Sequence, residues 1–212
     1  MRYKRHEYLF RQQNIVEYEF KAGFALTSEI IDMKCIHGDI VAILHSDSLC
    51  TYNLTGSLIN SHRFRTSLGT NSCIACINDC KIAATLPDHN LIHIVTFITL
   101  TTTTDLETPA ETRITGGITY RMDILYVAFS DAIRLMDLSG QIQKVISIPS
   151  VNILHYMNND KMLCVYSKDD SDKTVSCLDC TNDSLYDFER FLSIPKMLLL
   201  MMLVILFSLK MV

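Results

Sequence analysis

Short apolar runs separated by polar turns recur along the chain. Four segments share one pattern, in which an apolar run, a turn of two or three polar residues and a second apolar run follow one another. Their turns are His37-Gly38-Asp39, Asn78-Asp79, Arg121-Met122-Asp123 and Asn158-Asn159-Asp160. The turns begin at residues 37, 78, 121 and 158, so the pattern returns every 37 to 43 residues. A period of about 40 residues built from short strands is typical of the blades of a β-propeller.

Further strands follow the first two in most units. Leu49–Leu54 precedes the turn Thr55-Gly56, and Ile133–Leu138 precedes the turn Ser139-Gly140. The threonine-rich run 99–104 suits an outer strand or its exposed loop, because β-branched residues favour strands. The sequence therefore predicts an all-β protein, a β-propeller with about four blades of four antiparallel strands. A six-bladed ring at this period needs about 240 residues, so we expect an incomplete piece of such a ring.

The pattern divides the chain into three parts. We expect a helix or coil over residues 1–14 and a partial propeller over 15–195, which begins with a strand at Ile15–Phe20. An apolar tail, 196–212, follows. An open ring would leave edge strands uncovered, and we expect such a chain to aggregate or to need a partner.

The tail contains the unbroken apolar run Met197–Phe207. A membrane-spanning helix needs about 20 apolar residues, so a tail anchor is one interpretation but the run is short for it. Reading the codons of Met201-Met202 in a shifted frame gives an aspartate, and permissible codons around it would continue a propeller strand and its hairpin. We therefore interpret the tail as an out-of-frame or mis-spliced continuation of a fifth blade.

Composition narrows the function classes. The net charge is −4 and the chain has no tryptophan, which argues against a basic, aromatic nucleic-acid-binding face. The charged N-terminus, Met1–Tyr8, is not followed by an apolar stretch of signal-peptide length. We therefore expect a cytoplasmic chain whose thiols stay reduced. Membrane contact is expected only through the apolar tail.

The eight cysteines include two pairs with CxxC spacing, Cys73/Cys76 and Cys177/Cys180. The two pairs lie about 100 residues apart, whereas zinc sites of this kind separate theirs by roughly 12–20. Cys73 and Cys76 also fall in a predicted strand, where residues three apart point to opposite faces. We interpret the cysteines as small buried apolar residues. His89 and His93 fall in a loop and a strand, so their spacing of four does not predict a metal-binding helix face.

Catalytic and cofactor motifs are missing from the sequence. It contains no GxGxxG, P-loop or GxSxG motif. We therefore predict no catalytic, cofactor-binding or metal-binding residues and no cofactor. Binding residues of propellers usually sit on loops, and the candidate loops are Asp88-His89-Asn90, Ser167–Asp172 and Asn182-Asp183.

Two segments carry a family resemblance. Gly117–Val127, followed by Asp137–Gly140, resembles the C-terminal propeller of invertebrate tripartite-motif (B-box) proteins, a group expanded in molluscs. Ile15–Phe20 and Ser167–Phe188 are similar to other strands of that propeller, so the resemblance covers about residues 15–195. Its wider relatives are NHL-type, six-bladed propellers. The family usually has a glycine at the turn that is Met122-Asp123 here, and its absence is expected to weaken the hairpin.

The resemblance implies a non-catalytic, protein-interaction module. In that family the propeller recruits substrates, whereas ubiquitin-ligase activity resides in a RING domain that this sequence does not contain. We expect a protein partner and no enzymatic activity. The alternatives are a tail-anchored membrane protein, an RNA-binding NHL-type propeller and a metal-dependent propeller hydrolase.

Overall fold

Four antiparallel sheets make up the structure. The computed structural model describes residues 29–37, 40–53, 55–157, 160–169 and 172–187. Each sheet contains four strands in which each strand pairs with the next along the chain, and the sheets follow one another as four propeller blades. In the described residues the only helix is a short 3-10 turn, η1 (Pro87–His89). The predicted all-β fold with about four four-stranded blades is therefore confirmed.

The strands of each blade run in sequence order from the innermost to the outermost. Blade 1 contains β1 (Ile30–His37), β2 (Ile40–His45), β3 (Ser48–Asn53) and β4 (Leu58–Arg63). Blade 2 contains β5 (Ile74–Asn78), β6 (Lys81–Leu86), β7 (Leu91–Phe97) and β8 (Thr101–Glu107). Blade 3 contains β9 (Ile114–Arg121), β10 (Ile124–Phe129), β11 (Ile133–Met136) and β12 (Ile142–Ile146). Blade 4 contains β13 (Val151–Tyr156), β14 (Lys161–Asp169), β15 (Asp172–Asp179) and β16 (Ser184–Asp187).

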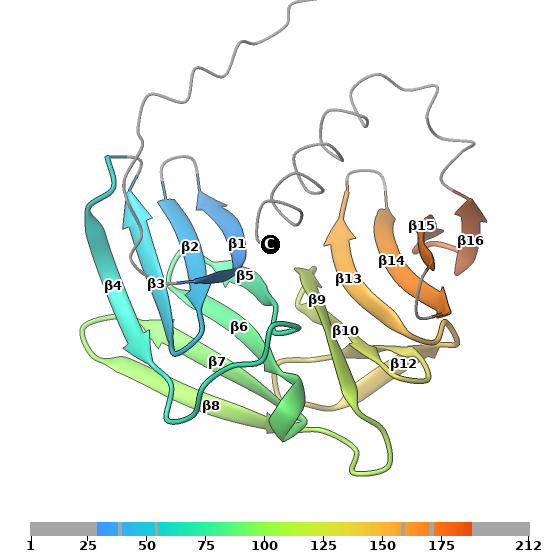
Figure 1. Cartoon of the computed structure of the whole chain (residues 1–212), viewed down its shortest axis with the longest axis horizontal. Coiled ribbons are helices and arrows are strands. Elements are labelled where there is room, and N and C mark those ends of the chain that lie inside the picture. The colour runs from blue at the N-terminus through green and yellow to red at the C-terminus, as the bar shows by residue number, and fades with distance from the viewer. Residues whose placement is uncertain (1–28, 38–39, 54, 158–159, 170–171, 188–212) are drawn as a thin grey trace, which may run out of the picture.

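The four sheets follow an arc with β1, β5, β9 and β13 on its inner side (Figure 1). A four-stranded meander places its first and third turns at one end of the sheet and its second turn at the other. We call the first end the hairpin face; its described turns are 55–57, 79–80, 98–100, 122–123, 137–141 and 180–183. The opposite end, which we call the connection face, carries the remaining turns and the links between blades: 46–47, 64–73, 87–90, 108–113, 130–132 and 147–150.

The turns between the third and fourth strands repeat one hydrogen-bonding device. Asn53 and Asp137 each accept, through Oδ1, the backbone N–H groups two and four residues further on, at 2.8–3.1 Å. Asp179 accepts the N–H two residues further on, at 3.0 Å. A short polar side chain that bonds the following backbone in this way stabilises a turn. Blade 2 departs from the pattern, because its third strand ends on Phe97.

The turn Met122-Asp123 joins β9 to β10. Arg121 pairs directly with Ile124, so the loop contains two residues, and both have positive φ, at 45° and 63°. This left-handed geometry matches the twist of a hairpin but normally requires glycine or asparagine. The hydroxyl of Tyr120 donates to Asp123 Oδ1 at 2.8 Å, which supports the turn. The hairpin therefore forms without the glycine that the family resemblance led us to expect.

The hydrophobic core lies between successive sheets. Leu44 and Ile82 belong to the cluster between blades 1 and 2, Ile92 and Phe129 to that between blades 2 and 3, and Leu154 to that between blades 3 and 4. Each of these five side chains is at most 2% exposed. Successive blades thus bury their facing sheet surfaces against each other, and the packing of a blade depends on the blades beside it.

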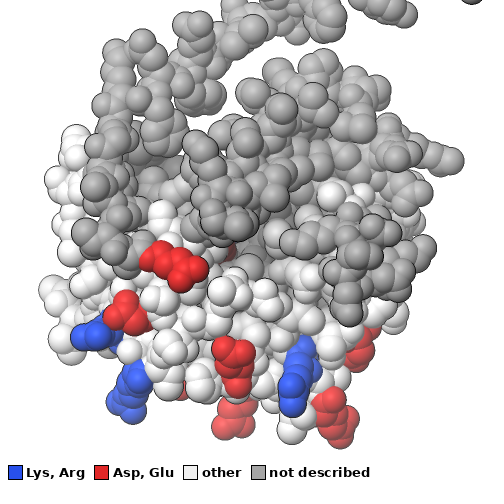
Figure 2. Space-filling view, viewed as in Figure 1, with Lys and Arg blue, Asp and Glu red and all other residues white. Residues whose placement is uncertain are grey.

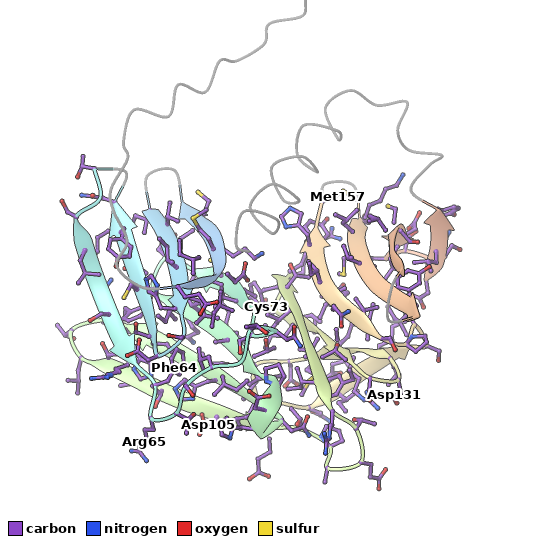
Figure 3. The ribbon with its side chains drawn as sticks, in the orientation of Figure 1. Phe64, Arg65, Cys73, Asp105, Asp131 and Met157 are labelled. Atoms are coloured by element: carbon purple, nitrogen blue, oxygen red, sulfur yellow. The ribbon has the colours of Figure 1, made fainter. Side chains whose placement is uncertain are left out.

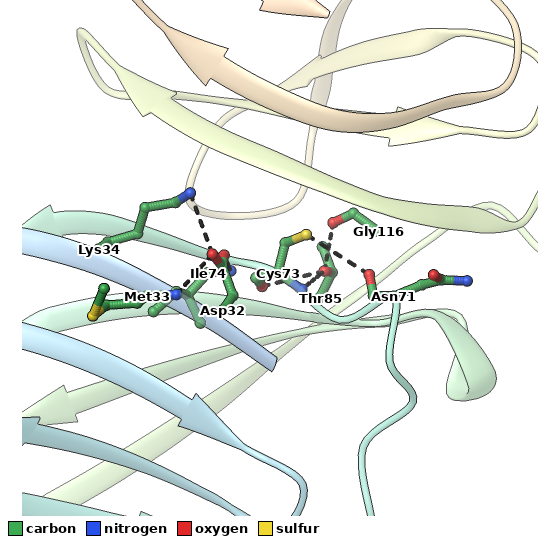
Figure 4. Close-up of polar contacts among 8 residues, drawn as sticks. All are labelled: Asp32, Met33, Lys34, Asn71, Cys73, Ile74, Thr85 and Gly116. Carbon is green, nitrogen blue, oxygen red and sulfur yellow. Dashed lines mark hydrogen bonds and ion pairs between the residues drawn. The ribbon is translucent and has the colours of Figure 1, made fainter. Parts of the chain in front are cut away.

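The innermost strand of blade 3 approaches the backbone of both neighbours closely. A Cβ atom on Gly116, whose φ is +129°, would lie 2.0 Å from the carbonyl oxygen of Asn71. A Cβ atom on Gly117 would lie 3.0 Å from the nitrogen of Leu154 in β13. The buried hydroxyl of Thr85 donates to the Gly116 carbonyl at 2.6 Å and accepts the Cys73 N–H at 2.9 Å (Figure 4). These contacts tie blade 3 to blades 2 and 4.

Several sequence predictions lie outside the described residues. They are the N-terminal segment 1–14, the strand Ile15–Phe20 and the apolar tail 196–212. Among the described ranges, none of the helices has the length and apolar character needed to cross a membrane.

The Thr85 hydroxyl provides a test of the joint between blades 2 and 3. Thr85→Val keeps the shape but leaves the Gly116 carbonyl and the Cys73 N–H without this partner, so we expect the free energy of unfolding to fall by about 2–3 kcal/mol. Thr85→Ser keeps the hydroxyl and removes one methyl, at a cost of about 1 kcal/mol. Urea unfolding followed by circular dichroism measures both. Equal losses for the two variants would show that the hydroxyl does not hold this joint.

Candidate functional site

A pocket lies where the four innermost strands converge. Its volume is about 220 Å³ and its lining comes from β1, β5, β9 and β13: Lys34, Cys35, Ile74, Ala75, Cys76, Thr119, Tyr120, His155 and Tyr156. One strand from each blade contributes, so the pocket exists only when all four blades are assembled. Its lining combines one cation, one imidazole, two phenols, two thiols and one aliphatic hydroxyl with two apolar side chains.

The polar groups beside this pocket are bonded to one another. Asp32 accepts the backbone N–H of Met33 and of Ile74, each at 2.8 Å, and its carboxylate lies 3.4 Å from Lys34 Nζ (Figure 4). The bond to Ile74 links β1 to β5. Asp32 therefore joins blade 1 to blade 2, and the pairing with Asp32 raises the pKa of Lys34 against the opposing effect of burial.

Cys73, which directly precedes β5, and Cys76, which lies within it, face different surroundings. Cys76 packs against the core between blades 1 and 2, whereas Cys73 packs against the core between blades 2 and 3. The prediction that residues three apart point to opposite faces is thereby confirmed. Burial raises the pKa of Cys76 to about 12 and that of Cys73 still further, so both thiols stay protonated at neutral pH.

The second CxxC pair lies in blade 4, far along the arc from the first. Cys177 is buried in β15 and Cys180 is partly buried just after it. All eight cysteines are free thiols. Within the described ranges, no group of three or more His, Cys, Asp or Glu side chains is arranged to hold a metal ion.

His155 brings a titratable ring into the pocket from blade 4. Burial lowers its pKa, the charge of Lys34 on the opposite blade lowers it further, and Asp32 acts in the opposite direction. The ring is therefore neutral at physiological pH. Lys34 and His155 line the same pocket, so the inner strands of the first and fourth blades face each other across it.

An ion pair joins blades 3 and 4 beside the pocket. Arg121 of β9 is paired with Asp160, and its guanidinium lies over the ring of Tyr156 at 4.5 Å from the centroid. The Tyr156 hydroxyl accepts the Asp160 N–H at 3.3 Å. Further out, Lys144 Nζ lies 2.7 Å from the carboxylate of Asp183. These ion pairs link neighbouring blades. Because each charge is already paired, it is less available to bind a ligand.

A histidine cluster that the sequence did not reveal bridges blades 1 and 2 near the connection face. His62 of β4 stacks on His93 of β7 at 5.3 Å, and Phe64 packs edge-on against both rings at 5.1 and 5.5 Å. His93 Nδ1 is hydrogen-bonded to Asp105 of β8. Figure 3 shows Phe64, Arg65 and Asp105 at this end of the molecule and Met157 at the other. Burial lowers the pKa of His62, and the nearby His93 lowers it further. The cluster packs two blades together and uses His93, but not His89.

The candidate loops do not converge. Asn90 lies at the connection face, where its side chain donates to the carbonyls of Pro109 and Thr112 at 3.2 and 2.9 Å and accepts the Ile114 N–H at 2.8 Å. Its role is to fix the link between blades 2 and 3.

The other two candidate loops also lack a common site. The turn Asn182-Asp183 lies at the hairpin face, where Asp183 is paired with Lys144. In Ser167–Asp172, residues 170–171 lie outside the described ranges. These loops are therefore separate features of two blades and two faces.

The connection face carries charges that pair among themselves. Arg63 lies 3.3 Å from Asp47. Arg134 forms a two-pronged pair with Asp131 at 2.8 and 2.9 Å, and this bonding lowers the pKa of the Asp131 carboxyl. Figure 2 shows charged side chains of both signs along this end of the molecule.

Exposed apolar side chains gather at the other end. Of the large hydrophobic residues that are exposed in the described structure, all except Val145 lie at a turn of the hairpin face or within two residues of one: Leu58, Ile59, Ile98, Leu100, Met122, Ile142 and Leu185. We refer to these seven as the hairpin-face apolar set. Met122 and Leu100 are the most exposed, at 77% and 76%. Every blade contributes at least one member.

Comparison with known proteins places the chain among β-propellers. No protein-family model matches the sequence, and the search of curated proteins returned no match. The structure is similar to hydrazine synthase of Kuenenia stuttgartiensis, with a TM-score of 0.58 and 12% identity over 76% of this chain and 48% of that chain. It is also similar to glutaminyl cyclase of Myxococcus xanthus, with a TM-score of 0.54 and 9% identity over 73% of this chain and 67% of that chain.

A third similar structure is the WD40 domain of Pan2 from Neurospora crassa. Its TM-score is 0.52, and the 14% identity extends over 74% of this chain and 51% of that one. The chain thus spans about half the length of two of these three proteins. The structural similarity shows a shared propeller fold, and at identities this low it shows the fold alone.

The pKa of His155 predicts a pH dependence of stability. Because the folded-state pKa lies below the unfolded value of about 6.5, the unfolded chain binds more protons between the two values, and stability falls as the pH drops through that window. His155→Gln removes this titration, so we expect the melting temperature to fall less between neutral and mildly acidic pH than it does in the wild type. Thermal melts across a pH series measure the difference. His89→Gln, at an exposed position, is the control and should keep the wild-type slope; a wild-type slope in His155→Gln would refute the assignment.

Proposed function

We propose that the chain is a non-catalytic protein-binding module that holds a partner protein on its hairpin face. The observation that carries this proposal is the hairpin-face apolar set, which the four blades present at one end of a rigid arc. Large apolar side chains left in water at one face favour burial against another molecule. The connection face is a weaker candidate, because Arg63 and Arg134 there are already paired with neighbouring carboxylates.

Met122 is the member of the hairpin-face apolar set with a strained backbone. It holds a left-handed backbone conformation that disfavours a side chain, and it is 77% exposed. Glycine at this turn would remove the strain. A strained residue that displays an apolar side chain to solvent is a reason to suspect a binding role. Met122 is also well suited to contact, since its flexible thioether adapts to irregular surfaces.

The family resemblance supports a more specific form of the proposal. Gly117–Val127 resembles the C-terminal propeller of tripartite-motif proteins, which recruits substrates. Met122 lies within that segment, at the tip of the hairpin that the resemblance covers. We therefore propose a substrate-recruiting role in the cytoplasm, in which a partner with an apolar contact surface is held near the Met122 turn.

Met122→Gly separates binding from folding. Relief of the left-handed strain exceeds the entropy cost of glycine, so we expect the free energy of unfolding to rise by roughly 0.5–1 kcal/mol. Loss of a central apolar contact should weaken partner binding about tenfold or more. Crosslinking in cells followed by mass spectrometry, with the recovered partner then purified and titrated against both chains, measures this effect.

Ser150→Gly is the matched control for that experiment. Ser150 is exposed, has a φ of 57° and lies at the connection face, so glycine there relieves the same kind of strain at the opposite end. It should leave partner binding unchanged. The proposed function is wrong if Met122→Gly is stabilised yet binds every recovered partner as the wild type does, or if Ser150→Gly loses them equally.

A further inference from the structure

The outer strand of blade 2 differs from the other outer strands. Within the described residues β8 pairs only with β7, so its other edge presents unpaired backbone N–H and C=O groups. Six of its seven residues are exposed, and the first four, Thr101–Thr104, carry no charge. Threonine is β-branched and pairs well with threonine across strands. This edge therefore has the composition of a strand that accepts another strand.

The other three blades protect their outer edges. The pairing of β4 and that of β12 with the preceding strand each contain a register irregularity, and β12 also carries Lys144, which is paired with Asp183 of the next blade. β16 contains four residues and offers little length for pairing. Bulges, charges and short strands are the usual means of blunting an edge. β8 carries charges only at Asp105 and Glu107 and pairs with β7 in regular register over all seven residues, so Thr101–Thr104 have none of these protections.

The turn that leads into β8 departs from the repeat as well. In three blades the side chain of Asn53, Asp137 or Asp179 closes this turn by accepting backbone N–H groups. Blade 2 instead places Ile98 and Leu100 there, 69% and 76% exposed. An apolar turn beside an unprotected strand lies where a second strand would cover both.

We propose that β8 pairs antiparallel with β8 of a second copy of this chain and so forms a two-fold symmetric dimer. In such a pair, directly opposed residues are both hydrogen-bonded or both not, so the two-fold axis lies between the two copies of one residue. When the axis lies between the two copies of Thr102, Thr101 of one copy lies opposite Thr103 of the other. The alternative places the axis between the two copies of Thr103. The pairing joins two blades into one eight-stranded sheet and covers the threonine edge.

The charges of β8 are compatible with self-pairing. When the axis lies between the two copies of Thr102, Asp105 of one copy lies opposite Thr99 of the other. The two Asp105 residues are then about 20 Å apart along the strands, beyond a Debye length of roughly 8 Å at physiological salt. Leu100 lies opposite Thr104, where the second strand shields it from water. A parallel arrangement would instead set Asp105 beside Asp105.

Sedimentation velocity of the full chain over a ~hundredfold range of concentration tests the proposal, since a dimer appears by mass action. We expect a concentration-dependent dimer in the wild type. Thr102→Lys and Thr103→Lys should each raise the dissociation constant by about tenfold or more, the larger effect marking the residue at the axis. Ser61→Lys, on the exposed outer strand β4, is the matched control and should dimerise like the wild type.

Hydrogen exchange covers the case in which the lysine variants fold poorly. The amides of Thr101–Thr104 that face outward should exchange more slowly as the wild-type concentration rises. A wild type that stays monomeric throughout, a dimer unaffected by both lysines, or equal loss in Ser61→Lys would overturn the proposal. Met122→Gly leaves β8 intact and should dimerise normally, so failure here is distinguishable from failure of the proposed binding function.

Discussion

The close approach of the innermost strands is the constraint on which the rest of the structure depends. Blade 3 can reach its neighbours only because Gly116 and Gly117 carry no side chain where the Asn71 carbonyl and the β13 backbone lie. The fully buried Thr85 hydroxyl then satisfies the Gly116 carbonyl. With these contacts made, the apolar faces of successive sheets meet and form the three interblade clusters. Without them the blades would be separate sheets with uncovered faces.

The same constraint decides which parts of the molecule remain available to ligands. Asp32 and Arg121 are used to tie one blade to the next and Lys34 is paired with Asp32, which leaves a small pocket among the inner strands. The inner-strand contacts of Gly116, Gly117 and Thr85 involve neither the hairpin-face turns nor β8. The exposed apolar residues and the uncharged threonine edge therefore lie there, on parts of the blades that can vary without loss of the core.

The repeat made much of the fold predictable. Apolar runs and polar turns at a period near 40 residues determined the blade number, the strand count and the position of most hairpins, because each blade is built from local antiparallel pairs. The turns that follow two of the third strands were visible as Thr55-Gly56 and Ser139-Gly140, whereas the bonds that Asn53 and Asp137 make there came only from the structure. The site was much less predictable: Asn90 looked like an exposed loop residue but fixes a link between blades, and the stack of His62 on His93 joins residues far apart in sequence.

The sequence by itself determined the local hairpins and their order, since the alternation of apolar and polar positions and the turn chemistry act over a few residues. Only the tertiary structure decided which residues meet between blades. Lys34, Cys76, Tyr120 and His155 come from four blades and line one pocket because inner strands converge on a common axis. Likewise, the exposed apolar residues form a set because alternate turns of every meander emerge at the same end. Both groupings follow from the packing of whole sheets, which no short stretch of sequence specifies.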